Sequence, residues 1–266
     1  MKRLFAILLL LVSLFCLCSC KKKQEDPPAE TIYSVEFSVT LLPYAAVVPG
    51  TQSVKAGEKA TEPAVSVTPS AGYVVIWTAD PSARTPYDFN AAVEKDLLLY
   101  AVETPRAYRV TYLTERGTVP ASNPTSFTKE TETFALKAVT LDQLGADFGY
   151  EFLNWSYYDD PDSIVNEIPK GTEGDVILRA KISPIRYDVY YKECDLASDT
   201  YLYGETKALP TPEREGSEFL GWTIYMDGAH TPVTALTPAF VKGNWMALFH
   251  GNGSGIGLEA NWREKE

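Results

Sequence analysis

Apolar and polar side chains alternate in short segments along residues 33–262, and glycine and proline separate these segments. Alternation with a period of two is typical of β-strands, in which successive side chains leave opposite faces. No long segment repeats apolar residues at positions i, i+3, i+4 and i+7, the spacing of an amphipathic helix. The pattern therefore predicts a mainly β protein with little or no helix.

The strand pattern occurs three times along the chain. Each copy begins with an alternating segment, and the first residues of these segments are Tyr33, Tyr108 and Tyr187. Each copy then has a glycine and an aromatic segment ending in tryptophan, at 72–77, 149–155 and 216–222. A final strand closes each copy, at 97–101, 176–180 and 258–262. Self-similarity at this spacing indicates tandem structural repeats.

The third copy carries the fullest motif. Residues 203–205, 209–212 and 216–222 read Y-G-E, L-P-T-P and G-S-E-F-L-G-W, and residues 260–262 read A-N-W. This order resembles the internalin B-repeat family, also called the Listeria-Bacteroides repeat, which is found in surface proteins. The second copy has Asn154 where the motif has its second glycine, and the first copy lacks both that glycine and the phenylalanine. The resemblance implies three tandem β-grasp-like repeats, with the first copy degenerate.

The N-terminal residues resemble a bacterial lipoprotein signal peptide. Lys2 and Arg3 precede an apolar stretch at 4–17, which is shorter than the roughly 20 residues of a membrane-spanning helix. Residues 17–20 read L-C-S-C and resemble the lipobox, whose cysteine is acylated and becomes the new N-terminus. The resemblance implies lipid, such as palmitate, on Cys20 and attachment to a membrane through it. An ordinary signal peptide rich in cysteine is the alternative.

These segments divide the chain into five predicted parts. Residues 1–19 are the signal peptide, and residues 20–32 are the acylated cysteine with a charged, proline-bearing tether. The repeats follow, and we call them repeat 1 (33–104), repeat 2 (105–184) and repeat 3 (185–266). Repeat 3 carries an insertion, because its closing alanine lies 38 positions after its marker tryptophan, against 24 and 25 positions in the other copies.

The insertion contains the first group of candidate ligand-binding residues. An apolar segment at 240–250, a glycine-rich segment at 251–255 and a strand at 256–262 predict a hairpin. Trp245 and His250 are candidates to face a ligand, and packing of these aromatic side chains on the core is the alternative. The recurring Trp77, Trp155 and Trp222 are instead expected in the cores of their repeats, and stacking platforms for sugar rings are the alternative.

A second candidate lies at 155–162, where Tyr157 and Tyr158 run into three carboxylates. Oxygen-rich loops bind calcium, but this spacing is not that of an EF-hand and Pro161 interrupts it, so a solvated loop is the alternative. Neighbouring carboxylates in one loop also say nothing about the separation across a cleft that a glycosidase needs.

Charge and motifs narrow the expected function. Removal of Lys2 and Arg3 with the leader changes the formal net charge from −11 to −13, which makes nucleic acid an unexpected partner. The chain has only two histidines and neither a G-x-S-x-G nor an H-E-x-x-H motif, so we expect no catalysis, no metal and no cofactor.

We therefore expect a lipid-anchored protein of the outer membrane or cell surface. Its repeats are expected to act as an adhesion or interaction module that binds a protein or a glycan. The alternative is a glycan-binding lipoprotein of a carbohydrate-capture system, in which Tyr157, Tyr158 or Trp245 stacks on sugar rings.

Overall fold

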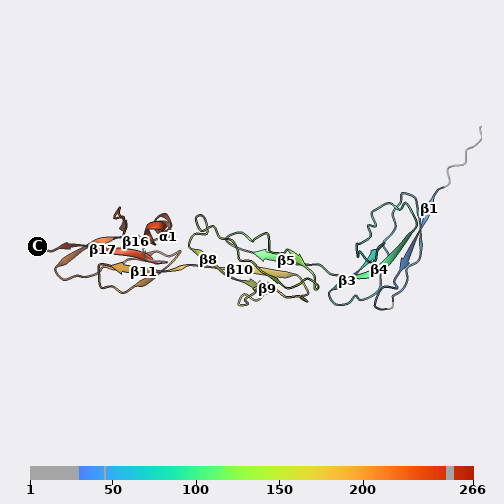
Figure 1. The fold of residues 1–266 in the computed structure, drawn as a ribbon, viewed down its shortest axis with the longest axis horizontal. Coiled ribbons are helices and arrows are strands. Elements are labelled where there is room, and N and C mark those ends of the chain that lie inside the picture. The colour runs from blue at the N-terminus through green and yellow to red at the C-terminus, as the bar shows by residue number, and fades with distance from the viewer. Residues whose placement is uncertain (1–29, 45, 250–254) are drawn as a thin grey trace, which may run out of the picture. The chain divides into compact units, whose positions relative to one another are not determined.

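The computed structural model describes residues 30–44, 46–249 and 255–266 (Figure 1). Strand accounts for 41% of these residues and helix for 4%, which confirms the predicted mainly β class. The chain forms two compact units: unit 1 extends to Ser70 and includes 75–104, and unit 2 comprises 71–74 and 105–266. Within the described ranges, no helix has the length and apolar character needed to cross a membrane.

Unit 1 is built on a four-stranded sheet. Its strands are β1 (Ile32–Ser38), β2 (Gln52–Lys55), β3 (Tyr73–Thr78) and β4 (Leu97–Pro105). Their order across the sheet is β2-β1-β4-β3. The first and last strands of the copy are parallel neighbours at the centre, with Val35 opposite Leu97, while β2 runs antiparallel along the edge of β1.

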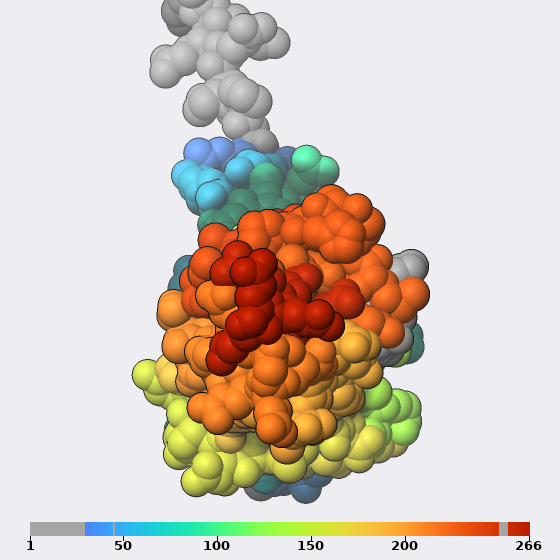
Figure 2. Space-filling model, turned by 90° about the vertical axis from the view of Figure 1, so that its left-hand side faces the viewer, coloured from blue at the N-terminus to red at the C-terminus, as the bar shows by residue number. Residues whose placement is uncertain are grey.

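Unit 2 contains two larger sheets. The first has the order β6-β5-β10-β8, with β5 (Tyr108–Leu113), β6 (Ser126–Phe127), β8 (Tyr150–Tyr157) and β10 (Val176–Pro184). The second has the order β12-β11-β17-β14-β15, with β11 (Arg186–Lys192), β12 (Asp199–Leu202), β14 (Ser217–Ile224), β15 (Pro232–Val233) and β17 (Ile256–Glu264). Two short ladders accompany them: β7 (Phe134–Ala135) with β9 (Glu167–Ile168), and β13 (Lys207–Ala208) with β16 (Ala235–Leu236). In Figure 2 the C-terminal end of β17, in dark red, lies at the surface, in agreement with the exposure of Arg263 and Glu264.

The three larger sheets share one arrangement. In each, the first and last strands of the copy are parallel at the centre and the tryptophan strand pairs with the last one. Val35, Val110 and Val189 occupy the same position in the first strand, and all three are buried. A parallel pair needs a long crossover connection. Here that connection is largely irregular, with a few short strands.

The marker tryptophans form the centre of the three cores, as expected. Trp77, Trp155 and Trp222 are only 3%, 2% and 4% exposed. Each indole N–H donates to a backbone carbonyl of the crossover segment: Pro63 at 3.1 Å, Lys137 at 2.9 Å and Pro210 at 2.8 Å, respectively. This hydrogen bond gives the buried indole N–H an acceptor, and it attaches the crossover segment to the tryptophan strand of the sheet.

A β-bulge explains the second glycine of the repeat motif. In repeat 3 the pairing of β14 with β17 skips Leu220, and Gly221 follows with a φ of +132°, a value that glycine adopts without steric cost. In repeat 2 the pairing of β8 with β10 skips Leu153. Both leucines are exposed, by 54% and 50%. The extra residue changes the phase of the strand, so that the phenylalanine and the tryptophan three positions later face the same core.

The insertion of repeat 3 is helical in the part that was predicted as the first strand of a hairpin, so that prediction is wrong. Helix α1 spans Pro238–Gly243 and helix α2 spans Trp245–Leu248. Thr237 caps α1, because its side-chain oxygen accepts the N–H of Phe240 at 3.1 Å, and Pro238 favours the first turn. The predicted turn falls mostly at 250–254, outside the described residues, whereas the predicted second strand is β17.

An aromatic contact joins the two larger sheets of unit 2. The ring of Tyr203, just after β12, packs edge-on against Phe148 and Tyr150, with centroids 5.5 and 5.6 Å away. Gly149 has a φ of +78°, and a Cβ placed there would lie 2.3 Å from the Tyr203 ring. Ile185 completes the connection by donating to the Gly149 carbonyl and accepting from the Tyr203 N–H. We call this set of contacts the Tyr203 clasp.

Candidate functional site

Two predicted site residues, Cys20 and His250, lie outside the described residues. Lipid attachment at Cys20 and a ligand-facing role of His250 therefore stay predictions. The structure places the other three candidates, Tyr157, Tyr158 and Trp245.

Tyr157 and Tyr158 have different environments. Tyr157 packs against the buried cluster of repeat 2, while Tyr158 is 54% exposed. Successive residues of an extended chain leave opposite faces, so the two rings do not form one stacking platform. Tyr158 donates its N–H to the carbonyl of Ile177, and the guanidinium carbon of Arg179 lies 5.1 Å from its ring centre.

The two tyrosines border an open hollow of about 440 Å³. Its other lining residues are Asp159, Thr172, Glu173, Asp175, Val176 and Ile177. Glu173 forms an ion pair with Lys129 at 2.9 Å, a contact that raises the pKa of this lysine. Asp175 accepts the backbone N–H of Arg109 at 2.8 Å. Two of the three carboxylates of the hollow therefore already have structural partners.

Trp245 lies in the insertion, at the start of α2. The helix buries Leu248 completely and leaves Trp245 39% and Met246 71% exposed. The four residues make one helical turn, which places this aromatic and thioether pair on the surface of repeat 3. Trp245 thus remains a candidate contact residue, on a helix and not on the predicted strand.

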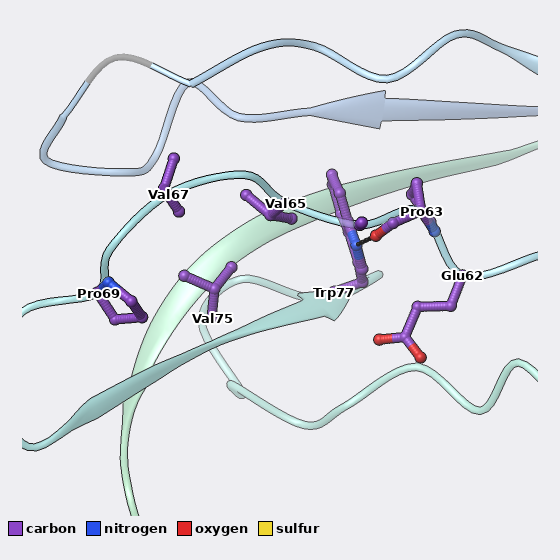
Figure 3. Close-up of a pocket in the computed structure, with 8 residues that line it drawn as sticks. Glu62, Pro63, Val65, Val67, Pro69, Val75 and Trp77 are labelled. Atoms are coloured by element: carbon purple, nitrogen blue, oxygen red, sulfur yellow. Dashed lines mark hydrogen bonds between the residues drawn. The ribbon is translucent and has the colours of Figure 1, made fainter.

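Repeat 1 has a groove that was not predicted from the sequence. It has a volume of about 360 Å³ and lies between β3 and the extended crossover segment 62–69 (Figure 3). Figure 3 shows Val65, Val67 and Pro69 on the crossover side, and Val75 and Trp77 on the other. The alternation of valine with serine and threonine at 65–68 was the available signal, but the sequence could not show which strand this segment faces.

A third hollow, of about 450 Å³, lies in repeat 2 and was also missed. Its lining includes three cationic side chains, Arg116, Arg179 and Lys181. They are far apart in the chain, since Arg116 follows β5 while the other two lie in β10. Over the ranges that the structure covers, no three His, Cys, Asp or Glu side chains are grouped so that they could hold a metal ion.

Comparison with known families identifies two of the repeats. The model of the Listeria-Bacteroides repeat domain matches residues 44–102 and 185–246. The first match falls in repeat 1, which is the copy with the degenerate motif. The second match falls in repeat 3. Repeat 2 lies outside the matched regions, although its sheet has the same strand order. No curated protein matches the chain. Regions of repeats 1 and 3 therefore match the Listeria-Bacteroides repeat domain, as the resemblance of the motifs predicted.

Proposed function

We propose that this chain is a non-catalytic, lipid-anchored protein of the outer membrane or cell surface, whose repeats form an adhesion or interaction module. The observation that carries the proposal is the family match over two separate regions, which indicates a surface-associated repeat module. The lipobox-like residues 17–20 supply the anchor in this proposal.

The geometry of the hollows supports binding over catalysis. The carboxylates Glu173 and Asp175 are held by Lys129 and by the backbone of Arg109. A general acid or base needs a proton-transfer partner within reach and a pKa suited to its role. These two carboxylates instead stabilise strand ends and loops, and the exposed Tyr158 beside them is available for contact with a partner.

The anchor is tested by expressing the full chain in bacteria supplied with labelled palmitate. We expect label and membrane attachment in the wild type and in Cys194→Ser, and loss of both in Cys20→Ser. Cys194 is the matched control because it is an unpaired cysteine in repeat 3. Labelling that persists in Cys20→Ser would contradict the proposed anchor.

The interaction function is tested with the unlipidated polypeptide 21–266, which retains every described element. Saturable binding to intact cells or to immobilised surface proteins and glycans is the expected result. Absence of saturable binding on all of these surfaces would contradict the interaction module while leaving the anchor intact.

A carbohydrate-capture function is the second candidate, and the exposure of Tyr158 beside the 440 Å³ hollow favours it. An exposed aromatic ring offers an apolar face for stacking. Neutral and acidic glycans bound by the wild type should be bound less by Tyr158→Ala or Trp245→Ala. Ile164→Ala, at a 71% exposed position of repeat 2, serves as the control. Saturable protein binding without any glycan binding would contradict this candidate.

A further inference from the structure

Three cations surround the 450 Å³ hollow of repeat 2. Arg179 and Lys181 alternate in β10 with the buried Leu178, so their side chains leave the face of the sheet that points away from the core. Arg116 reaches the same hollow from the loop after β5. The volume lies within the range of about 300–1,000 Å³ that is common for small-molecule sites.

Aromatic contacts hold both guanidinium groups. The guanidinium carbon of Arg116 lies 3.8 Å from the centre of the Tyr150 ring, and Nη1 donates to the Ala146 carbonyl at 3.2 Å. Arg179 lies against the Tyr158 ring at 5.1 Å. Stacking on a ring restricts the planar group while leaving N–H donors at its edge for a ligand. The two arginines are thus partly ordered before any ligand arrives.

None of these cations is neutralised by an ion pair. Among the described residues, no carboxylate oxygen lies within 4.0 Å of the charged nitrogens of Arg116, Arg179 or Lys181. Five other cations do form ion pairs: Lys55, Lys129, Lys170, Lys207 and Arg263. The chain has 35 acidic and 24 basic side chains, so three unpaired cations at one hollow are a local departure from its overall charge.

The rest of the lining narrows the ligand chemistry. Glu115 and Asp162 bring two carboxylates to the hollow, and Ser156 also lines it. The three cations and the two carboxylates give the lining a formal charge of +1. This charge matches a ligand with one carboxylate better than it matches a phosphate dianion. Guanidinium groups bind carboxylates through paired N–H donors, and the lining carboxylates accept hydrogen bonds from hydroxyl groups. A ligand that satisfies both sets carries one carboxylate and several hydroxyls.

We propose that this hollow binds an acidic sugar, with Arg116, Arg179 and Lys181 contacting its carboxylate and Glu115 and Asp162 accepting from its ring hydroxyls. The proposal rests on the interaction function above and gives it a ligand class. An aspartate or glutamate side chain of a protein partner fits less well, because it brings no hydroxyl donors for Glu115 and Asp162.

The test is calorimetric titration of polypeptide 21–266 with glucuronate, glucose and acetate. We expect measurable binding of glucuronate, at least ten-fold weaker binding of glucose, and no measurable binding of acetate. The double variant Arg179→Gln/Lys181→Gln should weaken glucuronate binding at least ten-fold. Lys170→Gln, which removes one positive charge at an exposed ion pair with Glu132, should leave it unchanged.

Three results would overturn the proposal. Equal binding of glucose and glucuronate would show that the cations do not select the ligand. Acetate binding as strong as glucuronate binding would show an anion site with no preference for sugar. Unchanged glucuronate binding in the double variant, with an unchanged circular dichroism spectrum, would place the site elsewhere. The broader interaction function is tested separately. If glucuronate does not bind in the titration but the double variant binds cells or immobilised proteins as the wild type does, the interaction function stands and only the acidic-sugar site is contradicted.

Discussion

At the scale of single residues, each core depends on what surrounds its marker tryptophan. Phe37, Tyr112 and Tyr191 occupy the same position of the first strand, and each contacts its tryptophan with centroids 5.0–5.2 Å apart. Repeats 2 and 3 add a second ring, since Phe152 and Phe219 pack edge-on against Trp155 and Trp222. Repeat 1 has one residue fewer between its glycine and its tryptophan, and Val75 packs against the core there and borders the groove of Figure 3.

Filling this groove should stabilise unit 1. We expect Val75→Phe to raise the free energy of unfolding by about 0.5–2 kcal/mol, the usual gain from filling a cavity. Slower hydrogen exchange of the Val35 and Leu99 amides, which lie in the core, would report it. Leu98→Phe adds a ring at a 43% exposed position of β4 and should give no comparable gain. Faster exchange in Val75→Phe would show that the groove cannot accept a ring.

The equivalent tyrosines Tyr112 and Tyr191 should respond differently to loss of the hydroxyl. Tyr112 donates to the Pro124 carbonyl at 2.9 Å, whereas the buried Tyr191 hydroxyl has no hydrogen-bond partner among the described residues. In urea unfolding, Tyr112→Phe should cost about 0.5–1.5 kcal/mol, and Tyr191→Phe should cost nothing or stabilise. A loss in Tyr191→Phe as large as that in Tyr112→Phe would contradict this difference.

Burial also gives these two tyrosines a pH dependence, because it raises the pKa of each from 10 to about 12. The folded state thus holds their protons more tightly than the unfolded state. The associated stability is fully present below pH 10 and is lost as the pH rises towards 12. Tyr191→Phe should therefore flatten the decrease in unfolding free energy over this interval, as measured by urea unfolding at each pH.

At the scale of elements, the insertion of repeat 3 shows how local signals compete. Residues 240–249 are rich in apolar side chains, and a short apolar segment is compatible with a strand or a helix. The capping residue Thr237 and Pro238 at the first position favour the helix, which buries Val241 and Leu248. Lys242 of α1 also donates to the carbonyl of Gly145 in repeat 2, which links the insertion to the neighbouring sheet.

The Thr237 cap should stabilise helix α1 of the insertion. Replacement of Thr237 by alanine removes the acceptor for the Phe240 N–H and should cost about 1 kcal/mol. Hydrogen exchange at Phe240 and Val241 should become faster, while Thr237→Ser, which keeps the hydroxyl, should exchange like the wild type. Equal exchange in the alanine and serine variants would show that packing alone holds the helix.

At the scale of the whole molecule, unit 2 depends on the Tyr203 clasp. Phe148 of repeat 2 belongs to the same buried cluster as Tyr203 and Trp222 of repeat 3. Shared burial of this kind couples the stability of neighbouring repeats, because neither keeps its full core without the other. We therefore expect repeats 2 and 3 to unfold together.

Breaking the clasp should separate this unfolding into two transitions. Gly149→Ala places a Cβ against the Tyr203 ring and strains a positive φ, so calorimetry should resolve two transitions for unit 2 where the wild type has one. Gly171→Ala is the matched control, because Gly171 has a φ of +89° with nothing within 4 Å of the added Cβ. A single transition in Gly149→Ala, lowered no more than in Gly171→Ala, would show that the clasp does not couple the repeats.

The sequence by itself determined the β class, the repeated strands and the burial of the marker tryptophans. These features follow from period-two alternation and from residues such as Gly221 that meet a local backbone requirement, so they can be read along the chain. The different environments of Tyr157 and Tyr158 were not predicted, because both were named as candidates to bind a ligand and only the structure separates them. The repeat family was likewise readable, because its motif consists of such local requirements.

Only the tertiary structure decided how the insertion packs, the Tyr203 clasp and the cationic hollow of repeat 2. Arg116 and Arg179 are 63 positions apart, and they meet because β5 and β10 are parallel neighbours. Gly149 and Tyr203 belong to different repeats, and the close approach between them is not encoded by either segment alone. Contacts of this kind depend on how packed strands bring distant side chains together, and this information is absent from local periodicity.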